Sequence, residues 1–301
     1  MKTSKLSFGL FVAPCLIAFL VVVIIPTFNG VIMSFTDWNG IDPNPEFVGL
    51  SNYAKIFTQD IVTTKFFYMD IEMPRFVSVF LFTAQFAIVS VILINLFGFG
   101  LALLVTRGLK GSNILRSVFF IPNLIGGLIL GFLWQFIFTK VFNHIGDIYG
   151  NEFLKGWLST TATGFWGLVI VLSWQMSGYM MIIYIAAIQN IPTSLFEAAD
   201  LDGANFLNKL KNIIVPLVAQ AFTIGLFLTL SNAFKLFDQN LALTNGGPYL
   251  STQMLALNIY RTAFVMQDFG QGQAKAVIFL IVVAGITLTQ MSISKKREVE
   301  F

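Results

Sequence analysis

The chain has 301 residues, of which 56% are hydrophobic and only 11% are charged, and its mean hydropathy is +0.79. Soluble domains average about 25% charged residues, so this sequence has too few charges to cover a surface that faces water. Its 18 basic and 15 acidic residues leave a net charge of +3, which gives no sign of the concentrated basic face that nucleic-acid binding needs. The composition predicts an integral membrane protein.

Residue types that metal and phosphate chemistry require are scarce. The single cysteine, Cys15, and the single histidine, His144, cannot form a disulfide, a thiolate metal site or a site with two histidines. The dipeptide Gly-Lys does not occur, so there is no GxxxxGK[ST] loop, and neither GxSxG nor HExxH is present. We therefore expect no catalytic residue, metal or cofactor in this chain, and any ATP must be bound by another chain.

Long apolar stretches recur along the sequence. A bilayer core about 30 Å thick is crossed by roughly 20 apolar residues in a helix. Stretches of about this length cover residues 10–35, 86–105, 117–138, 164–188, 213–234 and 276–293. Because unpaired backbone groups are costly in lipid, these stretches predict an all-α bundle of six transmembrane helices in one domain, residues 1–301. Pro26 predicts a kink or an end in the first helix, which we interpret as a retained helix because no signal-peptidase-like site follows it.

Basic residues in the connecting segments predict the orientation of the helices. Segment 106–116 carries Arg107, Lys110 and Arg116 and no acidic residue, and Lys295-Lys296-Arg297 follows the last stretch. Positive charges concentrate on the cytoplasmic side of membrane proteins, so both termini are predicted to be cytoplasmic. Two long segments, 36–85 and 235–275, would then be external. Aromatic residues in the first would mark the membrane interface or a surface for a partner.

Neutral polar and aromatic side chains occur inside the predicted helices, where charges are absent. They are Asn95, Asn123, Gln135, Trp174, Gln175, Tyr179, Thr229 and Asn232. The lack of ionisable groups argues against a proton relay or a voltage sensor. Hydrogen bonds between helices explain some of these residues, and a path for a neutral, hydroxyl-rich solute is the functional hypothesis. The pattern Gly127-x-x-x-Gly131 predicts close helix packing.

Segment 190–212, between the fourth and fifth stretches, has the pattern of a helix–turn–helix. Ser194 and Glu197 have the spacing of a capping box, and Gly203 is placed as the left-handed residue that ends the first helix. A second short helix should follow, with an apolar face formed by Phe206, Leu207, Leu210, Ile213 and Ile214. Two alanines would permit close approach by a partner. The alternative is a simple connection in which Glu197 only caps the helix.

This segment resembles the EAA motif of ABC-importer permeases. The matching run is Glu197-Ala198-Ala199-Asp200-Leu201-Asp202-Gly203-Ala204, followed by Ile214-Val215-Pro216. Residues 47–53 (FVGLSNY), 116–122 (RSVFFIP), 134–138 (WQFIF) and 243–248 (LTNGGP) are also similar to elements of the family. The last element resembles the carbohydrate subfamily, in particular the first membrane subunit of maltose- and glycerol-3-phosphate-type importers. The chain departs from the larger maltose-type subunit, which has additional N-terminal helices and an external domain.

The resemblance implies a type I importer permease, one transmembrane subunit that translocates a sugar or oligosaccharide by alternating access. It implies as partners a second homologous permease subunit, two ATP-binding subunits that hold ATP and Mg, an extracellular solute-binding protein and membrane lipid. No nucleic acid is expected. The implied location is a bacterial inner (plasma) membrane.

The resemblance also carries over two sets of residues. The EAA segment forms the coupling helix that docks in a cleft of the ATPase, which assigns this role to Glu197, Ala198, Ala199, Asp200, Asp202 and Gly203. The solute path lies on the flanking spans, which places Trp174, Gln175, Tyr179, Thr229 and Asn232 along it by location and not by specificity. The alternatives are a permease for another polar solute such as glycerol-3-phosphate, a secondary transporter, which the lack of an inverted repeat disfavours, and a membrane enzyme.

Overall fold

The structure is a computed structural model that describes residues 5–66, 69–108 and 111–295. The chain divides into two compact units, one of residues 1–77 and 258–281 and the other of residues 78–257 and 282–301. Helices dominate the described residues, with one two-stranded antiparallel sheet, and the predicted all-α class is confirmed. Lys110, Lys296 and Arg297, which entered the prediction of orientation, lie outside the described residues.

The first unit begins with a long apolar helix. Helix α1 (Lys5–Phe19) continues through a π-helical turn (Leu20–Ile24) into α2 (Ile25–Met33). Pro26 does not end the helical stretch, because the preceding turn widens and the Ile25 N–H bonds to the carbonyl of Leu20. None of the most apolar part of residues Gly9–Met33 is buried. Such a surface is typical of a helix that faces lipid or a partner subunit.

The FVGLSNY element closes the end of α2. Helix α3 (Ser51–Thr58) starts within it, and the buried Asn52 amide donates to the carbonyls of Ser34 (2.9 Å) and Thr36 (2.7 Å). Gly270, in the first turn of α14 (Phe269–Lys295), lies against the same turn, since a Cβ there would be 2.1 Å from the Thr36 oxygen. The element therefore fastens the end of α2 to the start of α14.

The predicted external segment 36–85 is not a plain loop. It contains α3 and a hairpin of β1 (Ile61–Phe66) and β2 (Met69–Pro74), paired from Ile61 with Pro74 to Phe66 with Met69. Helix α4 (Arg75–Val105) follows at once, eleven residues before the predicted start at residue 86. Its 31 residues span about 46 Å at 1.5 Å per residue. The helix is therefore longer than a bilayer core is thick.

Helix α8 (Thr161–Gln189) is the most buried helix of the second unit. A capping box between Thr160 and Thr163 begins it, and most of its residues from Gly164 to Ile188 are buried. Its neighbours approach closely through glycine. A Cβ at Gly98 of α4 would be 2.7 Å from the Met180 Cβ, and one at Gly178 would overlap the backbone of Phe119.

The prediction of one continuous third span, residues 117–138, is wrong. Helix α5 (Ser112–Phe120) passes into a 3-10 turn (Ile121–Leu124) and two extended residues before α6 (Gly127–Phe136) begins. Pro122 has no N–H to continue the helix. The helical stretch runs on through a π-helical turn (Ile137–Val141) and α7 (Phe142–Tyr149), so its apolar length is Gly127–Tyr149. Hydropathy misses this break because the residues within it are mostly apolar.

The fifth predicted span is also broken. Helix α10 (Phe206–Lys209), a π-helical turn (Leu210–Ile214) and α11 (Val215–Leu217) precede α12 (Ala219–Phe234), with a bend of 68° between Leu217 and Ala219. Among the described residues, five helices are long and apolar enough to cross a membrane, or six if this bent pair is one span. The sixth predicted span lies inside α14, and α14 extends beyond it at both ends.

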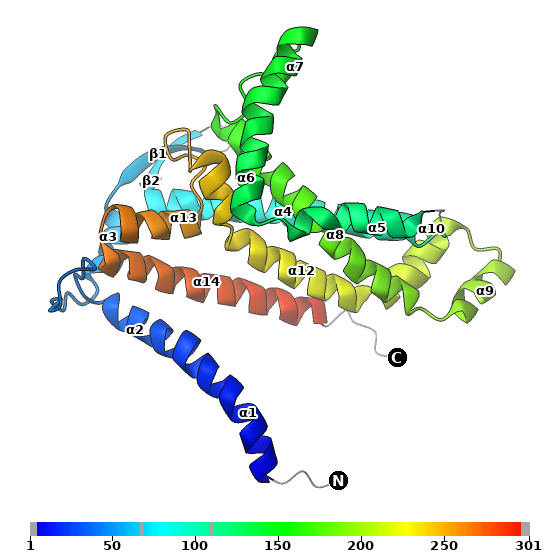
Figure 1. Ribbon diagram of the computed structural model, residues 1–301, viewed down its shortest axis with the longest axis horizontal. Helices are drawn as coiled ribbons and strands as arrows, with labels where there is room; N and C mark the ends of the chain where they lie inside the picture. Colours follow the sequence, from blue (N-terminus) through cyan, green and yellow to red (C-terminus); the bar gives the residue numbers. More distant parts are fainter. Residues whose placement is uncertain (1–4, 67–68, 109–110, 296–301) are drawn as a thin grey trace. The chain divides into compact units, whose positions relative to one another are not determined.

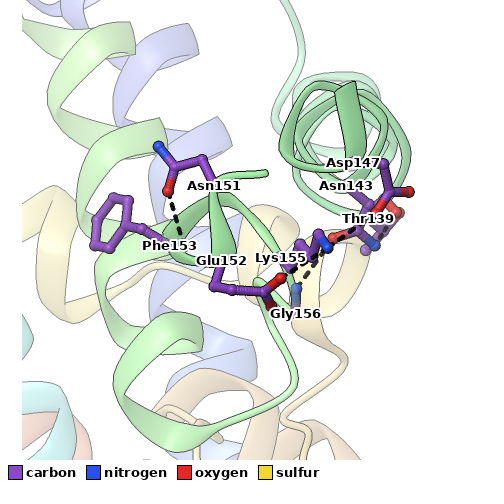
Figure 2. A network of polar contacts seen from close by, with 8 residues as sticks. All are labelled: Thr139, Asn143, Asp147, Asn151, Glu152, Phe153, Lys155 and Gly156. Atoms are coloured by element: carbon purple, nitrogen blue, oxygen red, sulfur yellow. Dashed lines mark hydrogen bonds and ion pairs between the residues drawn. The ribbon is translucent and has the colours of Figure 1, made fainter. Parts of the chain in front are cut away.

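A polar network closes the turn after α7 (Figure 2). The Lys155 ammonium pairs with Glu152 (2.9 Å) and Asp147 (3.1 Å), and these two hydrogen bonds raise the pKa of Lys155. The Asn143 side chain accepts from the Gly156 N–H and donates to the Thr139 carbonyl. In Figure 1, α6 continues into α7, and the α7 end of this rod points away from α8 and α12. The network therefore stiffens the free end of this rod.

Candidate functional site

A cavity of about 400 Å³ lies beside the middle of α8 in the second unit. Gln175, the central residue of α8, lines it. Other parts of the wall come from the break before α6 and from the end of α12. The polar lining residues are Asn123, Gln175, Tyr179, Asn232, Lys235, Asp238 and Gln239. The cavity can therefore offer amide donors and acceptors, a phenol and one charge of each sign to a polar solute.

Two glutamines connect the walls of the cavity. The Gln239 Nε2 donates to the Gln175 Oε1 at 2.6 Å, and the Gln175 Nε2 donates to the Ile125 carbonyl at 3.1 Å. Both side chains are buried, with exposed fractions of 6% for Gln239 and 9% for Gln175. The pair links α8 to the break before α6 and to the segment after α12.

Glycines let α6 lie directly on the segment after α12. A Cβ at Gly127 would be 2.6 Å from the Asp238 Cβ, and one at Gly131 would be 2.6 Å from the Ala242 Cβ. The close packing predicted from Gly127-x-x-x-Gly131 is confirmed. Asp238 thus lies at the amino end of α6, where the helix dipole favours a negative charge.

The LTNGGP element follows the cavity wall, and hydrogen bonds anchor it and the residues that flank it. Asn240 donates from Nδ2 to the Thr252 carbonyl (2.8 Å) and accepts at Oδ1 from the Met254 N–H (3.0 Å). The Thr252 hydroxyl donates to the Gly247 carbonyl (2.6 Å), and the Gln135 Nε2 donates to the Leu243 carbonyl (3.2 Å). These bonds hold the segment in place, so the element positions the wall of the cavity.

The structure brings together three of the five residues predicted for the solute path. Gln175, Tyr179 and Asn232 line the cavity. Thr229 does not, because it is fully buried and accepts a hydrogen bond from the Asn95 Nδ2 at 3.0 Å. The Tyr184 hydroxyl donates to the same asparagine. Thr229 therefore helps to join α4, α8 and α12.

Trp174 also lies away from this cavity. Its ring meets that of Trp134 at 5.5 Å in an edge-on contact, and it lines an apolar groove of about 600 Å³ together with Trp166 and Phe97. Adjacent residues of a helix point about 100° apart, so Trp174 and Gln175 face different neighbours.

Sequence reasoning missed three polar residues of the cavity. Lys235, Asp238 and Gln239 were assigned to the external segment 235–275. The helical spacing from Asn232 to Lys235 and Gln239 was a signal that the face of α12 continues past its end. Lys235 and Asp238 are exposed, and neither forms an ion pair within the described part of the chain.

The helix predicted over the EAA segment is present as α9 (Thr193–Leu201), but its start differs from the prediction. Its N-cap is Pro192, and no side chain caps it. The capping box of Ser194 and Glu197 is therefore wrong, because Ser194 is already the second residue of the helix. Glu197, Ala198, Asp200, Asp202 and Gly203 are exposed, and Ala199 is half-buried. The helix presents most of its surface to its surroundings.

The end of α9 matches the prediction for Gly203. Its φ of +71° is left-handed, the Ala204 N–H bonds to the Ala199 carbonyl (2.8 Å) and the Gly203 N–H to the Asp200 carbonyl (3.1 Å). These are the two bonds of a Schellman motif. The turn fixes the direction in which the chain leaves α9.

The second predicted helix is present as α10, which continues through the π-helical turn into α11, and Asn205 caps it by accepting from the Asn208 N–H at Oδ1 (2.9 Å). Of its predicted apolar face only Ile214 is buried. Two contacts hold this region: the ion pair of Lys209 with Asp200 on α9, and the Arg107 guanidinium 4.3 Å from the centre of the Phe206 ring. Movement of α9 would therefore reach α10 directly.

Comparison with known proteins agrees with this geometry. Residues 94–295 match the family described as binding-protein-dependent transport system inner membrane component. The crystal structure of a bacterial ABC transporter that imports the acidic polysaccharide alginate includes a chain that matches with a TM-score of 0.80 at 19% identity, covering 97% of this chain and 96% of that one. The chain belongs to this family of membrane components and has the type I importer permease fold, which makes it a multipass transport permease.

Two relatives cover almost the whole chain. The probable starch degradation products transport system permease protein AmyD of Thermoanaerobacterium thermosulfurigenes is 52% identical over 293 residues, which are 97% of this chain and 95% of that protein. The trehalose/maltose transport system permease protein MalF of Thermococcus litoralis is 30% identical over 302 residues, 98% and 96% of the two chains. The predicted resemblance to carbohydrate permeases is confirmed.

Proposed function

We propose that this chain is one transmembrane subunit of an importer for a sugar or oligosaccharide, driven by ATP hydrolysis in a partner. The observation that carries the proposal is the cavity beside Gln175. Gln175 is the middle residue of α8, and a rise of 1.5 Å per residue puts it about 21 Å from either end. This is near the midplane of a bilayer core about 30 Å thick.

The lining of the cavity favours a neutral solute. Lys235 and Asp238 supply one charge of each sign, and the other polar groups are amides and a phenol. Such a lining offers paired donors and acceptors to hydroxyl groups without net attraction for an anion. A relative named for starch degradation products supports a maltooligosaccharide. Glycerol-3-phosphate, the alternative, would meet a single cation and a carboxylate.

The two broken spans suit alternating access. Transporters often place the solute at discontinuous helices near the bilayer midplane, and the break before α6 forms part of the cavity wall. We assign α9 as the coupling helix that docks on the ATPase, with Glu197, Ala198, Ala199, Asp200, Asp202 and Gly203 at the contact. Closure of the ATPase would move α9, then α10 through the Lys209–Asp200 pair, and so the bent fifth span.

The proposal includes partners for this chain. A second permease subunit completes the membrane pore, two ATP-binding subunits hold ATP and Mg, and an extracellular solute-binding protein delivers the sugar. No cofactor is assigned to this chain. The crystal structure of a bacterial alginate ABC transporter in complex with a periplasmic protein supports the last partner, because a chain of it matches this fold with a TM-score of 0.79. We place the complex in a bacterial cell membrane.

An Asn232→Ala variant is expected to lower uptake of maltotriose about tenfold. The Asn232 side-chain amide is exposed at the cavity and bonds within its own helix to the Leu228 carbonyl (2.8 Å), so it can turn toward a solute. Loss of about 1.4 kcal/mol of hydrogen bonding to a solute is a factor of ten. Uptake of maltotriose by proteoliposomes that contain the whole complex measures this loss. The control is Asn44→Ala, which replaces an exposed asparagine of the first unit. Normal uptake in the Asn232 variant would remove it from the path, and uptake of glycerol-3-phosphate instead would favour the alternative.

Reporter fusions test the orientation, with both termini proposed to be cytoplasmic. A reporter inserted in segment 106–116 and one fused after Arg297 should be cytoplasmic, because basic residues flank both positions. A reporter at Gly150, between α7 and the turn of Glu152–Leu154, should be external. Cysteine accessibility or an alkaline phosphatase fusion reads the side. Detection of the Arg107 segment outside the cell would reverse the assignment of α9 to the ATPase side.

A further inference from the structure

The pair of buried glutamines has a role beyond lining the cavity. We propose that Gln175 and Gln239 form a releasable latch, which holds the break before α6 and the segment after α12 against α8 and so sets the closed position of one cavity wall. They are positioning residues, and the proposal rests on the transport function proposed above. In this conformation the latch is closed, with both hydrogen bonds made.

The amide of Gln175 is committed to protein partners. Its Oε1 accepts from Gln239 and its Nε2 donates to the Ile125 carbonyl. By contrast, Asn232 is exposed and bonds only within its own helix among the contacts described. Gln175 therefore acts on the solute through the segments it holds, whereas Asn232 is available to contact it.

The latch acts on backbone that has no helical partner. The first turn of α6 is closed by the Leu130 N–H on the Gly126 carbonyl, and Gln175 supplies a donor to the preceding carbonyl, that of Ile125. The bond to the Ile125 carbonyl is partly buried, and a carbonyl shielded from water without a donor is unfavourable. Release of Gln175 thus leaves the break free to take another position and find another donor.

The two segments held by the latch are packed together. Gly127 and Gly131 lie against Asp238 and Ala242 without intervening side chains. The break and the segment after α12 should consequently move as one wall. Neutral hydrogen bonds are weak net contributors to stability when both groups find other partners, and the polar cavity beside the pair offers such partners, so the pair can separate when closure of the ATPase moves the wall.

A reversible cross-link distinguishes a latch from a fixed support. In a Cys15→Ser background, which removes the only cysteine of the sequence, Gln175→Cys and Gln239→Cys are joined by a short bifunctional methanethiosulfonate reagent in the complete transporter. We expect the cross-link to abolish maltotriose uptake and the ATP hydrolysis stimulated by the binding protein, and reductant to restore both to the level before treatment. Each single cysteine variant with the same reagent is the control. Full transport by the cross-linked protein would overturn the proposal.

An isosteric variant tests the hydrogen bond itself. Gln239→Glu keeps the shape of the side chain but cannot donate to the Gln175 Oε1. We expect the maximal uptake rate to fall at least fivefold while the KM for loaded binding protein changes less than twofold, with no further loss when Gln175→Ala is added, because the two residues act as one unit. Additive losses, or a change confined to KM, would contradict the latch. ATP hydrolysis reports on the latch whichever solute is carried. If the parent protein hydrolyses ATP but does not take up maltotriose, the result counts against the proposed sugar and not against the latch.

Discussion

A Gly178→Ala variant is expected to lose the packing of α5 on α8 and with it all uptake. The added Cβ would lie 1.8 Å from the carbonyl oxygen of Phe119 and 2.4 Å from its carbonyl carbon. These are backbone atoms at the end of α5, so no rotation of a side chain can make room. Overpacking a core costs about 1–3 kcal/mol even where side chains adjust, and the loss here should exceed about 3 kcal/mol. That is a large part of a total stability of about 5–15 kcal/mol.

Thermal unfolding of the detergent-purified protein and its elution as a single species measure this effect. Gly100→Ala is the matched control, because Gly100 lies within α4 and no atom is within 4 Å of a Cβ built there. We expect the control to unfold at or slightly above the wild-type temperature, since alanine favours helix over glycine. A wild-type unfolding temperature for Gly178→Ala would show that α5 does not pack on α8 in this way.

A Gly203→Val variant is expected to insert and fold but to transport nothing. Gly203 has a φ of +71°, which costs a residue with a Cβ about 1–2 kcal/mol and a β-branched residue more. Nothing lies within 4 Å of a Cβ at this position, so the penalty comes from the backbone alone and is confined to the turn. The Schellman bonds to Ala199 and Asp200 should break, and α10 would leave α9 in another direction.

Uptake and ATP hydrolysis of the reconstituted complex separate this effect from misfolding. We expect the unfolding temperature of Gly203→Val to stay within a few degrees of the wild type, while stimulated ATP hydrolysis or attachment of the ATPase is lost. Gly203→Asn is the control, because asparagine adopts left-handed backbone readily, and it should retain most of the uptake. If Gly203→Val transported at the wild-type rate with coupled hydrolysis, α9 would be a plain connection.

Features that depend on neighbouring residues in the chain could be read from the sequence. Apolar length predicted the membrane helices, because lipid imposes the same requirement on each one. The left-handed turn at Gly203 was predictable for a similar reason, since glycine adopts positive φ at little cost. The start of α9 was not predictable in this way, because Pro192 occupies the N-cap position that the prediction gave to Ser194.

Hydropathy did not predict the breaks in the third and fifth spans, and a tertiary contact helps to hold the first of them. Residues 121–126 are mostly apolar, so hydropathy treats them as helix, yet the Ile125 carbonyl finds its donor on Gln175 of α8. The bend between Leu217 and Ala219 likewise lies inside an apolar stretch. A chain can leave the helical path in lipid only where its backbone groups find partners. The partner of Ile125 is distant in sequence, whereas at the bend the Val218 N–H bonds to the Ile214 carbonyl and the Phe222 N–H to the Val218 carbonyl within the same span.

The same holds for the members of the solute cavity. By itself the sequence determined that neutral polar side chains lie within membrane helices, and it named Thr229 and Asn232 alike. Only the tertiary structure separated them: Asn95 of α4 bonds to Thr229 and buries it, while Asn232, three residues later, is exposed at the cavity. A polar group in an apolar helix must find a partner, but whether this partner is another helix or a solute depends on which helices pack around it.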